Sequence, residues 1–487
     1  MNLMYNKYIQ FSFDINQLPE SKTIIINESK TPLAIAHAGS FRRLFLHFQL
    51  YELLCNKGFD VKFIFGNDDY DPLDYLPGYF SDEQNEFYKK YLGHPLSNIP
   101  SQVSNVSYAD FHFEKIINVL KYSFNIVPDV YKTSDLYKQG FFNDGIKLVL
   151  NNLKKITSLY ENVTGTADKF DERPIQVICP HCGNMRTTKV LEYREDEVLV
   201  SCEDAVIREI SLTGCGFNEW ISPFDGNSRL CWKLEWPVRW FYLNIDVEGG
   251  RKDQNSSLGA RQFAELLYKL LFDKKPPVNL PYDFCYVRSA HSSQVNRFGV
   301  SIFEALKFMP PQMFFNLVTK EKSTRPYDLD LESEKMFKLY EEYYQNEVRH
   351  ISHYDFDSIL HHARFFSEDE SDLSTEQKSF ILCLRHFLET SLSEGAWLIV
   401  NDVNKVDIKY RTLVNSLVAN FKKVQHWNAQ IIQDLFRETC IESNVPFSEA
   451  CLVVYEMLIK RRTGPRIGIL FENIGQQKTV NLLVSAV

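Results

Sequence analysis

Residues 23–27 read TIIIN, residues 37–57 read HAGSFRRLFLHFQLYELLCNK, and residues 61–65 read VKFIF. The first and last runs are rich in β-branched and aromatic residues, which predicts two strands, and the apolar residues of the middle run recur at helical spacing. A polar loop with Pro32 leads into the helix, and Gly58 follows it. Strand, loop, helix and strand in this order predict a parallel α/β sheet, in which ligands bind beyond the carboxyl ends of the strands.

The composition is that of an ordinary globular protein. The chain has 487 residues, of which 44% are apolar and 24% charged, and this excludes a disordered or fibrous protein. At about 150 residues per domain, the length predicts roughly three domains. The net charge of −9 means that a polyanion would have to bind at a local basic patch, and we do not expect DNA as a partner.

The sequence carries no signal for export or for a membrane. Residues 1–16 contain Asp14 and no unbroken apolar run, and no later run approaches the ~18 apolar residues of a membrane span. We therefore expect a cytoplasmic protein without a membrane partner. In such a protein, ten cysteines indicate reduced thiols or a metal site rather than a disulfide framework.

The pattern changes twice along the chain. Residues 171–223 form short β-like runs with four of the ten cysteines, which predicts a small insertion. The α/β pattern returns over residues 232–305, and from residue 310 onward apolar residues recur at helical spacing. Packing in the core of a helical domain is the first explanation for these apolar stripes.

Four cysteines in the insertion have metal-site spacing. Cys179, Cys182, Cys202 and Cys215 follow the pattern C-x2-C-x19-C-x12-C, and glycines follow the second and the fourth. Tetrahedral thiolate coordination predicts a structural zinc ion with no open position for water, so a catalytic metal is not expected. His181 could replace one cysteine, and metal-free thiols are the alternative.

A second group of polar residues lies where the loop meets the first helix, in the segment HAGSFRR at residues 37–43. Two arginines in a first helical turn oppose the helix dipole, which makes sense if an anion binds the free amides there. Gly39 would let a nucleotide approach the backbone, and His37 could donate to a phosphate. The alternative is a plain helix start with solvated arginines.

These residues carry a resemblance. Residues 37–40 resemble the HIGH-type signature of class I aminoacyl-tRNA synthetases, and the rest of the chain resembles one family among them, the class I lysyl-tRNA synthetases. The landmarks follow in the family's order along nearly the whole chain. They are residues 58–61, 68–72 (DDYDP), 91–96 with 99–100, 137–140, the Cys179 segment, 232–240 (WKLEWPVRW, like the family's W-x-x-D-W-P-x-R-W), 252–254, 310–311 and 463–468.

The resemblance implies an α/β fold, a class I synthetase Rossmann catalytic domain with a small zinc-bearing β insertion and an all-α C-terminal domain. On this basis we place the first half of the catalytic domain at residues 1–170, the zinc-binding insertion at 171–223, the second half with the signature loop at 224–308, and a helical tRNA-binding-like domain at 309–487. ATP is the implied substrate, with Mg²⁺, and Zn²⁺ is structural. The implied partners are tRNA and an amino acid or small-molecule acceptor.

The resemblance also implies roles for single residues. The candidate catalytic residues are His37, Gly39, Ser40 and His291. The candidate nucleotide-binding residues are Lys252, Asp253 and Gln254, with Asp253 on a ribose hydroxyl. The candidate substrate-binding residues are Arg43, Asp68, Asp69, Trp236, Arg239 and Trp240, although core packing explains the tryptophans almost as well.

The loop that should carry a KMSKS-type motif departs from the family. Counting back from residues 310–311 places residues 291–296 (HSSQVN) there, and both expected lysines are absent. A lysine in this loop neutralises the pyrophosphate as ATP is attacked, and losing such a preorganised cation typically costs ~10²-fold or more in rate. His291, Arg288 or Arg297 could substitute in part.

The residues expected to contact the amino acid depart as well. Ser40 stands where the family has Asn and keeps a hydrogen-bonding group. Arg43 stands where the family's pattern is acidic, which is the charge a lysine ammonium needs, so Arg43 should repel a cationic side chain. The family's G-K-D-H is RKDQ here, at residues 251–254.

The leading hypothesis is a paralogue that activates an amino acid other than lysine as an aminoacyl-adenylate and passes it to tRNA or another acceptor. Two rivals are a pseudo-synthetase that only binds tRNA and a transferase that takes aminoacyl-tRNA as donor without ATP. Loss of the loop lysines favours the rivals, whereas His37 and Asp253 favour ATP use. A housekeeping lysine enzyme ranks last.

Overall fold

The computed structural model describes residue 18 and residues 22–165, 174–256, 259–289, 299–320, 323–333, 335–348, 359–360, 363–364, 373–390, 399 and 403–487. The expected signature loop at residues 291–296, with His291, lies outside the described residues. The chain divides into two compact units. The first runs to Val287 and includes two later segments that end at Ile302 and Leu329, and the second holds most of the chain from Asp330 to Val487.

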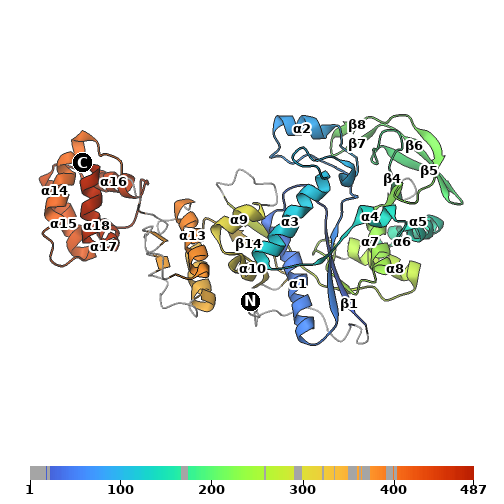
Figure 1. Ribbon diagram of the computed structural model, residues 1–487, viewed down its shortest axis with the longest axis horizontal. Coiled ribbons are helices and arrows are strands. Elements are labelled where there is room, and N and C mark those ends of the chain that lie inside the picture. Colours follow the sequence, from blue (N-terminus) through green and yellow to red (C-terminus); the bar gives the residue numbers. More distant parts are fainter. Residues whose placement is uncertain are drawn as a thin grey trace. The chain divides into compact units, whose positions relative to one another are not determined.

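A parallel sheet forms the centre of the first unit (Figure 1). Its strand order is β12-β11-β1-β2-β3, and each neighbouring pair is parallel. The strands are β1 (Ile24–Lys30), β2 (Val61–Asn67), β3 (Asp129–Lys132), β11 (Val247–Glu248) and β12 (Val278–Asn279). The order reverses between β1 and β11, so the carboxyl ends of these two strands mark the place where a doubly wound fold binds its ligand.

The strand–helix–strand unit expected at the start of the chain is confirmed. Helix α1 (Phe41–Asn56) joins β1 to β2, whose residues pair in register from Ile24 with Val61 to Lys30 with Asn67. Ile24 and Ile26 on one face of β1 are fully buried, and Ile25 on the opposite face is half-buried against the cluster that contains Trp240, because a parallel sheet is covered on both faces. Apolar residues at both faces explain why the run TIIIN shows no alternation.

Further helices of the first unit form where the sequence indicated them or between the landmarks. Helix α2 (Asp82–Lys89) begins with a capping box made by Ser81 and Gln84, and α3 (Tyr108–Phe124) ends at Asn125, whose φ is +55°. The others are α4 (Thr133–Lys138), α5 (Asn143–Asn151), α6 (Leu153–Thr164), α7 (Trp232–Tyr242) and α8 (Ala260–Phe272).

Short antiparallel strands make up the predicted insertion. Strands β5 (Thr188–Arg194), β6 (Glu197–Cys202) and β9 (Asn218–Ile221) form one sheet, and β7 (Ala205–Ile207) pairs with β8 (Ile210–Leu212). Strand β4 (Ile175–Val177) enters the insertion and pairs with β10 (Ser228–Leu230), which leads out of it into α7. This pairing closes the insertion at its base.

The chain beyond residue 310 is mainly helical, as the sequence indicated. It contains α10 (Pro311–Lys320), α11 (Lys335–Tyr343) with a π-helical turn (Tyr344–Val348), and α13 (Thr375–Thr390), and α9 (Ile302–Phe308) precedes them. The sequence missed β14 (Tyr327–Asp330), the one strand in this part among the described residues, which pairs with β13 (Cys285–Arg288). Isolated bridging strands of four residues leave no periodic signal to detect.

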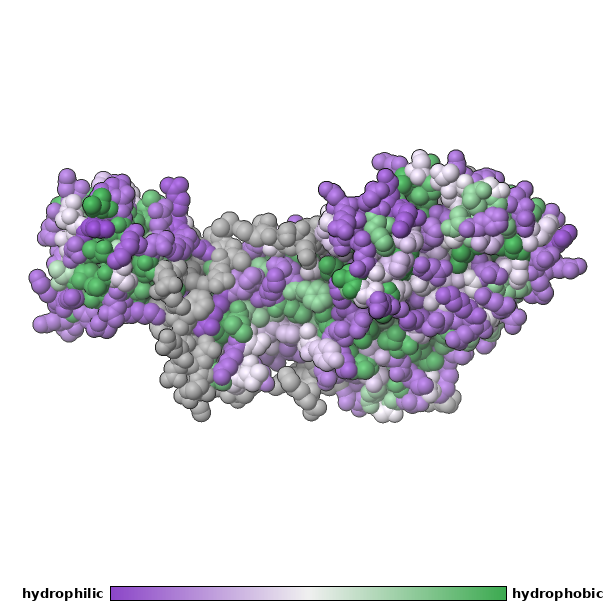
Figure 2. All heavy atoms as spheres, turned by 45° about the horizontal axis from the view of Figure 1, so that its top comes forward, coloured by the Kyte–Doolittle hydropathy of each residue, from purple (hydrophilic) through white to green (hydrophobic). Residues whose placement is uncertain are grey.

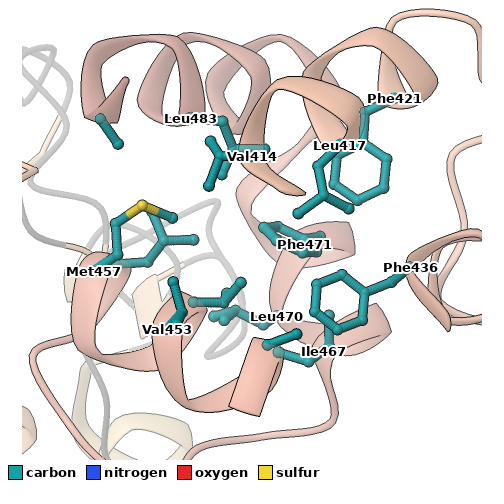
Figure 3. Packing of buried hydrophobic residues seen from close by; sticks show 14 of the residues in the cluster. Val414, Leu417, Phe421, Phe436, Val453, Met457, Ile467, Leu470, Phe471 and Leu483 are labelled. Atoms are coloured by element: carbon teal, nitrogen blue, oxygen red, sulfur yellow. The ribbon is translucent and has the colours of Figure 1, made fainter. Parts of the chain in front are cut away.

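The last helices have a core of their own (Figure 3). They are α14 (Arg411–Phe421), α15 (Ala429–Glu442), α16 (Phe447–Leu458), α17 (Ile467–Ile474) and α18 (Gln476–Ala486). Leu417, Phe436 and Phe471 are fully buried in one cluster with residues from all five helices. The apolar stripe at residues 431–459 therefore belongs to two helices, which separate at Asn444 (φ +54°) and Pro446.

The face of the molecule drawn in Figure 2 carries mostly hydrophilic side chains, with hydrophobic ones scattered among them. Among the described residues, no helix combines the length and the apolar character that crossing a bilayer requires.

A glycine-to-alanine change in the last helices should loosen their core. A Cβ on Gly468 would lie 2.0 Å from the carbonyl oxygen of Ala429, so Gly468→Ala must push α17 away from α15 at a cost of about 1–3 kcal/mol. We expect faster amide hydrogen exchange across residues 411–487. Gly78→Ala, where a Cβ meets nothing within 4 Å, is the control, and equal exchange in both variants would contradict the prediction.

Candidate active site and metal centre

A pocket of about 480 Å³ lies at the carboxyl ends of β1 and β11, within the first unit. The ends of these two strands form part of its wall, together with the loop and turn that precede α1 and the beginning of the loop that follows β2. The segment from β10 into α7 and the loop before β13 complete it. Its lining includes Glu28, Ser29, Lys30, His37, Gly39, Ser40, Arg42, Arg43, Asp68, Asp71, Arg229, Glu235, Trp236, Arg239, Glu248, Arg251, Gln254, Tyr282 and Asp283.

The pocket brings together eight of the thirteen catalytic, nucleotide-binding and substrate-binding residues expected from the sequence. His37, Gly39, Ser40, Arg43, Asp68, Trp236, Arg239 and Gln254 line it. Asp69, Trp240, Lys252 and Asp253 are not among its lining residues. His291 lies outside the described residues.

A chain of alternating charges runs along one wall of the pocket. Asp71 accepts from Arg229, Arg229 Nη2 donates to Glu235 Oε2 over 2.7 Å, Glu235 also accepts from Arg239, and Arg239 Nη1 lies 2.8 Å from Asp68 Oδ1. Arg229, Glu235 and Arg239 are buried, whereas Asp68 and Asp71 at the two ends are 15% and 24% exposed. This series of ion pairs contains three carboxylates and two guanidinium groups. Each carboxylate lies beside an arginine, which fixes the geometry of the charges.

The arginines decide how Asp68 ionises. Burial alone would raise the pKa of Asp68, but Arg239 and a 2.7 Å hydrogen bond from Ser29 Oγ hold this pKa below its ordinary value. Asp68 is therefore a carboxylate at neutral pH. Its neighbour Asp69 has a different task, since it accepts 2.8 Å and 2.5 Å hydrogen bonds from the amide and hydroxyl of Ser134 and so holds the start of α4.

Sequence reasoning missed Glu235 and Arg229. Glu235 stands four residues before Arg239 on α7, which is the spacing of a helical ion pair, so this signal was present in the motif WKLEWPVRW. Arg229 gave no such signal, because its partner Asp71 is 158 residues away. It reaches the pocket because β10 pairs with β4 at the base of the insertion.

Arg43 is neutralised by the protein itself. Its guanidinium lies 3.3 Å from Glu28 Oε1 and donates to the carbonyl oxygen of Ser29, and it hydrogen-bonds Tyr282. Burial would lower the pKa of Arg43, but Glu28 and Tyr282 raise it above its ordinary value. Glu28 is thus the acidic partner of Arg43 and not a free carboxylate in the pocket.

His47 lies next to this ion pair but remains neutral. Its Nε2 accepts a 2.8 Å hydrogen bond from the amide of Gly249, so the proton belongs on Nδ1, which lies 2.7 Å from the carbonyl oxygen of Arg43. Burial lowers the pKa of His47 despite the pull of Glu28 at 3.4 Å. Arg43 is therefore the cation that balances Glu28.

Two residues at or just before the start of α1 have structural roles that the sequence did not indicate. Arg42 is 1% exposed and donates to the carbonyl oxygens of Phe284 and Arg325 over 3.2 and 2.7 Å, so the alternative of solvated arginines is wrong for this residue. A Cβ on Gly39 would lie 1.9 Å from the carbonyl oxygen of Cys285. Gly39 is thus needed for the approach of β13, whatever a nucleotide requires.

His37 and Lys30 both line the pocket, and the pKa of each lies below its ordinary value. His37 precedes the short turn Ala38–Ser40, and its carbonyl oxygen accepts a 2.7 Å hydrogen bond from Ser40 Oγ. Burial, then Lys30 and Arg43, lower the pKa of His37 to about 3, so its imidazole is neutral. Burial, then Arg43, lower the pKa of Lys30 to about 8. Sequence reasoning did not single out Lys30.

The segment at residues 251–254 is held by its own side chains. Arg251 binds Asp253 through two hydrogen bonds of 2.5 and 2.6 Å, and Lys252 Nζ lies 3.0 Å from Asp283 Oδ2. Gln254 Oε1 accepts a 2.9 Å bond from the amide of Arg251. Asp253 is half exposed, and its ribose contact stays a prediction that must share the carboxylate with Arg251.

The two tryptophans of α7 have different environments. Trp236 lines the pocket, whereas Trp240 is fully buried with its ring centroid 5.4 Å from that of Trp236. Trp240 Nε1 donates a 2.5 Å hydrogen bond to Glu248 Oε2, and the guanidinium of Arg261 lies 4.4 Å from its ring centroid. Core packing is thus the structural explanation for Trp240.

The four predicted cysteines come together in the insertion. The Sγ atoms of Cys179, Cys182, Cys202 and Cys215 all lie within 4.8 Å of one another, with 3.5 Å between the first and the last and 3.7 Å between the middle pair. Tetrahedral Zn–S bonds of about 2.3 Å need S–S distances near 3.8 Å. His181 instead packs its ring 4.9 Å from that of Phe217, so it does not replace a cysteine. The cluster could hold a metal ion, and we propose zinc.

Metal analysis tests this proposal. We expect about one equivalent of zinc in carefully purified protein and a large loss in Cys182→Ser, because a site with three thiolates binds zinc less tightly. Cys55→Ser, which changes an exposed cysteine of α1 outside the cluster, should keep its zinc. Less than about half an equivalent in the wild type would contradict the assignment.

Glu248 should make stability depend on pH. Burial raises its pKa from 4.5 to about 7, although Arg239 and Arg261 oppose this. Between these values the folded chain holds a proton that the unfolded chain has lost, so the stabilising contribution is complete below the lower pKa and disappears as the pH rises through the upper one.

Glu248→Gln removes this titration and can still accept from Trp240. We therefore expect urea titrations to show a smaller fall in stability from about pH 5 to about pH 8 in Glu248→Gln than in the wild type. Glu192→Gln, at an exposed position of β5, is the matched control. An identical fall in Glu248→Gln and the wild type would show that Glu248 does not titrate in this range.

Known proteins with similar sequences cover most of the chain. A family model described as "tRNA synthetases class I (K)" matches residues 12–364. A lysine–tRNA ligase of Thermoplasma acidophilum is 24% identical over 92% of this chain and 92% of its own length. A lysine–tRNA ligase of Methanococcus maripaludis is 25% identical over 93% of this chain and 94% of its own length.

A solved structure of a glutamate–tRNA ligase from Elizabethkingia meningosepticum, in complex with its amino acid, is similar over 96% of this chain and 99% of that chain, with a TM-score of 0.41 and 13% identity. The family model matches more than half of the chain. This confirms the sequence prediction: the chain belongs to the class I lysyl-tRNA synthetase family and is a class I aminoacyl-tRNA synthetase-like protein.

Proposed function

We propose that this chain activates an amino acid other than lysine with ATP, as an aminoacyl-adenylate, and passes the aminoacyl group to tRNA or another acceptor. Membership of the family supports the reaction type. The position of the pocket also supports it, because the carboxyl ends of β1 and β11 are where this kind of sheet binds nucleotides.

One observation carries the exclusion of lysine, namely the ion pair between Arg43 and Glu28 in the pocket wall. An ammonium group at this place would meet a carboxylate that already has a cation, and it would also lie near Arg43 and Lys30. Replacing that cation would leave a guanidinium without its carboxylate in a buried site, which is unfavourable.

The reaction assigns tasks to the residues of the pocket. A carboxylate oxygen of the amino acid attacks the α-phosphorus of ATP, the bond to the β-phosphate oxygen breaks, and pyrophosphate leaves with the electron pair. His37, as a neutral imidazole, would donate a hydrogen bond to a phosphate, and Asp253 would accept one from the ribose. Mg²⁺ would neutralise phosphate charge when bound. The zinc ion is structural in this proposal, because four thiolates fill its coordination.

Lysine activation is the second candidate function. The names of the relatives favour it, since these relatives are lysine–tRNA ligases and match this chain over nearly their whole length. The pocket also offers a carboxylate, Glu248, that could face an ammonium group. This candidate requires the Glu28–Arg43 pair to have no effect on the choice of amino acid.

Release of AMP and pyrophosphate tests the proposal. Purified protein is incubated with ATP, Mg²⁺, total tRNA and each amino acid in turn, and we expect release with one amino acid that is not lysine. His37→Ala should slow release by about 10²-fold, because the phosphate loses a preorganised donor. His426→Ala, at an exposed position of the loop between α14 and α15, is the control for contaminating enzymes.

The outcomes separate the candidates. Release with lysine alone would replace the proposal by the second candidate. No release with any amino acid, in folded protein that binds tRNA, would overturn adenylate formation and favour a tRNA-binding pseudo-synthetase or an ATP-independent transferase.

A further inference from the structure

The pocket has an uneven charge pattern once its internal ion pairs are taken out. Its lining carboxylates are Glu28, Asp68, Asp71, Glu235, Glu248 and Asp283. All of them except Glu248 have an arginine or lysine nitrogen within ion-pair distance. Among the described residues, Glu248 is therefore the lining carboxylate without a cation at ion-pair distance, although Arg239 and Arg261 act on it from farther away.

Glu248 is 7% exposed and lies at the end of β11, next to the point where the strand order reverses. Within the described part of the chain, no cation lies within ion-pair distance of its carboxylate. Its hydrogen-bond donor is the neutral Nε1 of Trp240, which contacts one carboxylate oxygen. Burial favours the protonated form of Glu248 while the pocket is empty, and an ammonium group beside it would stabilise the carboxylate, because burial weakens competition from water.

Lys30 is the complementary case among the cations of the pocket. Arg43, Arg229, Arg239 and Arg251 each bind a carboxylate, and Arg42 donates to backbone carbonyl oxygens. Lys30, at the end of β1, has no ion-pair partner among the residues that the structure describes. Glu28 and Asp68 act on it from farther away, but each of them is already held by an arginine.

Lys30 and Arg43 form a positive end of the pocket. Each lies close enough to His37 to lower its pKa, and Arg43 lowers that of Lys30. With Glu28 paired to Arg43 and Asp68 paired to Arg239, the charge of Lys30 is the one at this end without an ion-pair partner among the described residues. An anion would remove it, whereas a second cation would double it.

We propose that the amino acid substrate has an acidic side chain, whose carboxylate faces Lys30 and Arg43 while its α-ammonium group faces Glu248. The inference rests on the proposed function, since it names the substrate class of the same site. The α-carboxylate remains for the attack on ATP. An α-amino dicarboxylic acid thus matches both unpaired groups, whereas lysine brings an ammonium to the positive end and a neutral amino acid leaves Lys30 unbalanced.

Equilibrium binding without ATP tests the substrate class separately from the chemistry. Full-length protein is titrated calorimetrically with L-aspartate, L-glutamate, L-asparagine, L-glutamine and L-lysine. We expect one of the two acids to bind about 10–100-fold more tightly than its own amide, and lysine to bind more weakly still. Tightest binding of lysine or of an amide would overturn the inference, as would binding of none of the five in protein that binds ATP.

Two variants tie the preference to the named residues. Lys30→Met keeps the length of the side chain and breaks no ion pair, so it should fold, and it should reduce the preference of the acid over the amide about tenfold or more. Arg43→Gln should act in the same direction but also releases Glu28. Lys338→Met, which removes an 80% exposed lysine of α11, should leave the preference unchanged. A preference that survives Lys30→Met would overturn the role of Lys30.

The outcome of the AMP assay is independent of this result. If an acid binds with the expected preference but no AMP forms with any amino acid, adenylate formation fails and the substrate class stands. If AMP forms only with lysine, the reaction type stands and the substrate class is wrong.

Discussion

The buried ion-pair chain from Asp71 through Arg229, Glu235 and Arg239 to Asp68 is the constraint on which the pocket depends. It joins three parts of the chain: the loop after β2, the strand β10 that leaves the insertion, and helix α7. Buried ion pairs are weak evidence for net stability, but removing one partner leaves a buried charge at a cost of about 3–5 kcal/mol. These ion pairs therefore limit which relative positions the three parts of the polypeptide can adopt.

This network also explains why the insertion matters for the pocket although its cysteines lie elsewhere in the unit. Strand β10 pairs with β4 and carries Arg229 between the fully buried Ser228 and Leu230. A metal ion held by the four cysteines would stabilise the fold of the insertion. Such an ion would act on the pocket through the backbone of β10 rather than by contact with a substrate.

Most charged side chains of the pocket are paired with other groups of the protein. This pairing determines which charges a ligand can contact. The sequence indicates that Arg42 and Arg43 form an anion-binding pair at a helix start. In the structure, however, Arg42 donates to backbone carbonyl oxygens and Arg43 pairs with Glu28. A ligand therefore interacts with the charge that remains after the cations and carboxylates of the pocket have paired with one another. Small changes at single positions, such as Lys30 or Arg43, therefore change the selectivity of the site more than its overall charge suggests.

The sequence by itself determined the β1–α1–β2 unit, the helical end of the chain and the cysteine cluster, because local periodicity or spacing indicates each of them. It also placed His37, Asp68, Trp236 and Arg239 at one site through the resemblance to a family. Only the tertiary structure decided that Asp69 holds the start of α4 through Ser134, that Trp240 packs in the core and that Glu28 neutralises Arg43. It alone also showed that Arg229 reaches Asp71 and that Glu248 and Lys30 have no ion-pair partner within the part of the chain that the structure describes. Such facts depend on distances between residues up to 158 positions apart and on burial, and neither quantity is expressed in a local pattern.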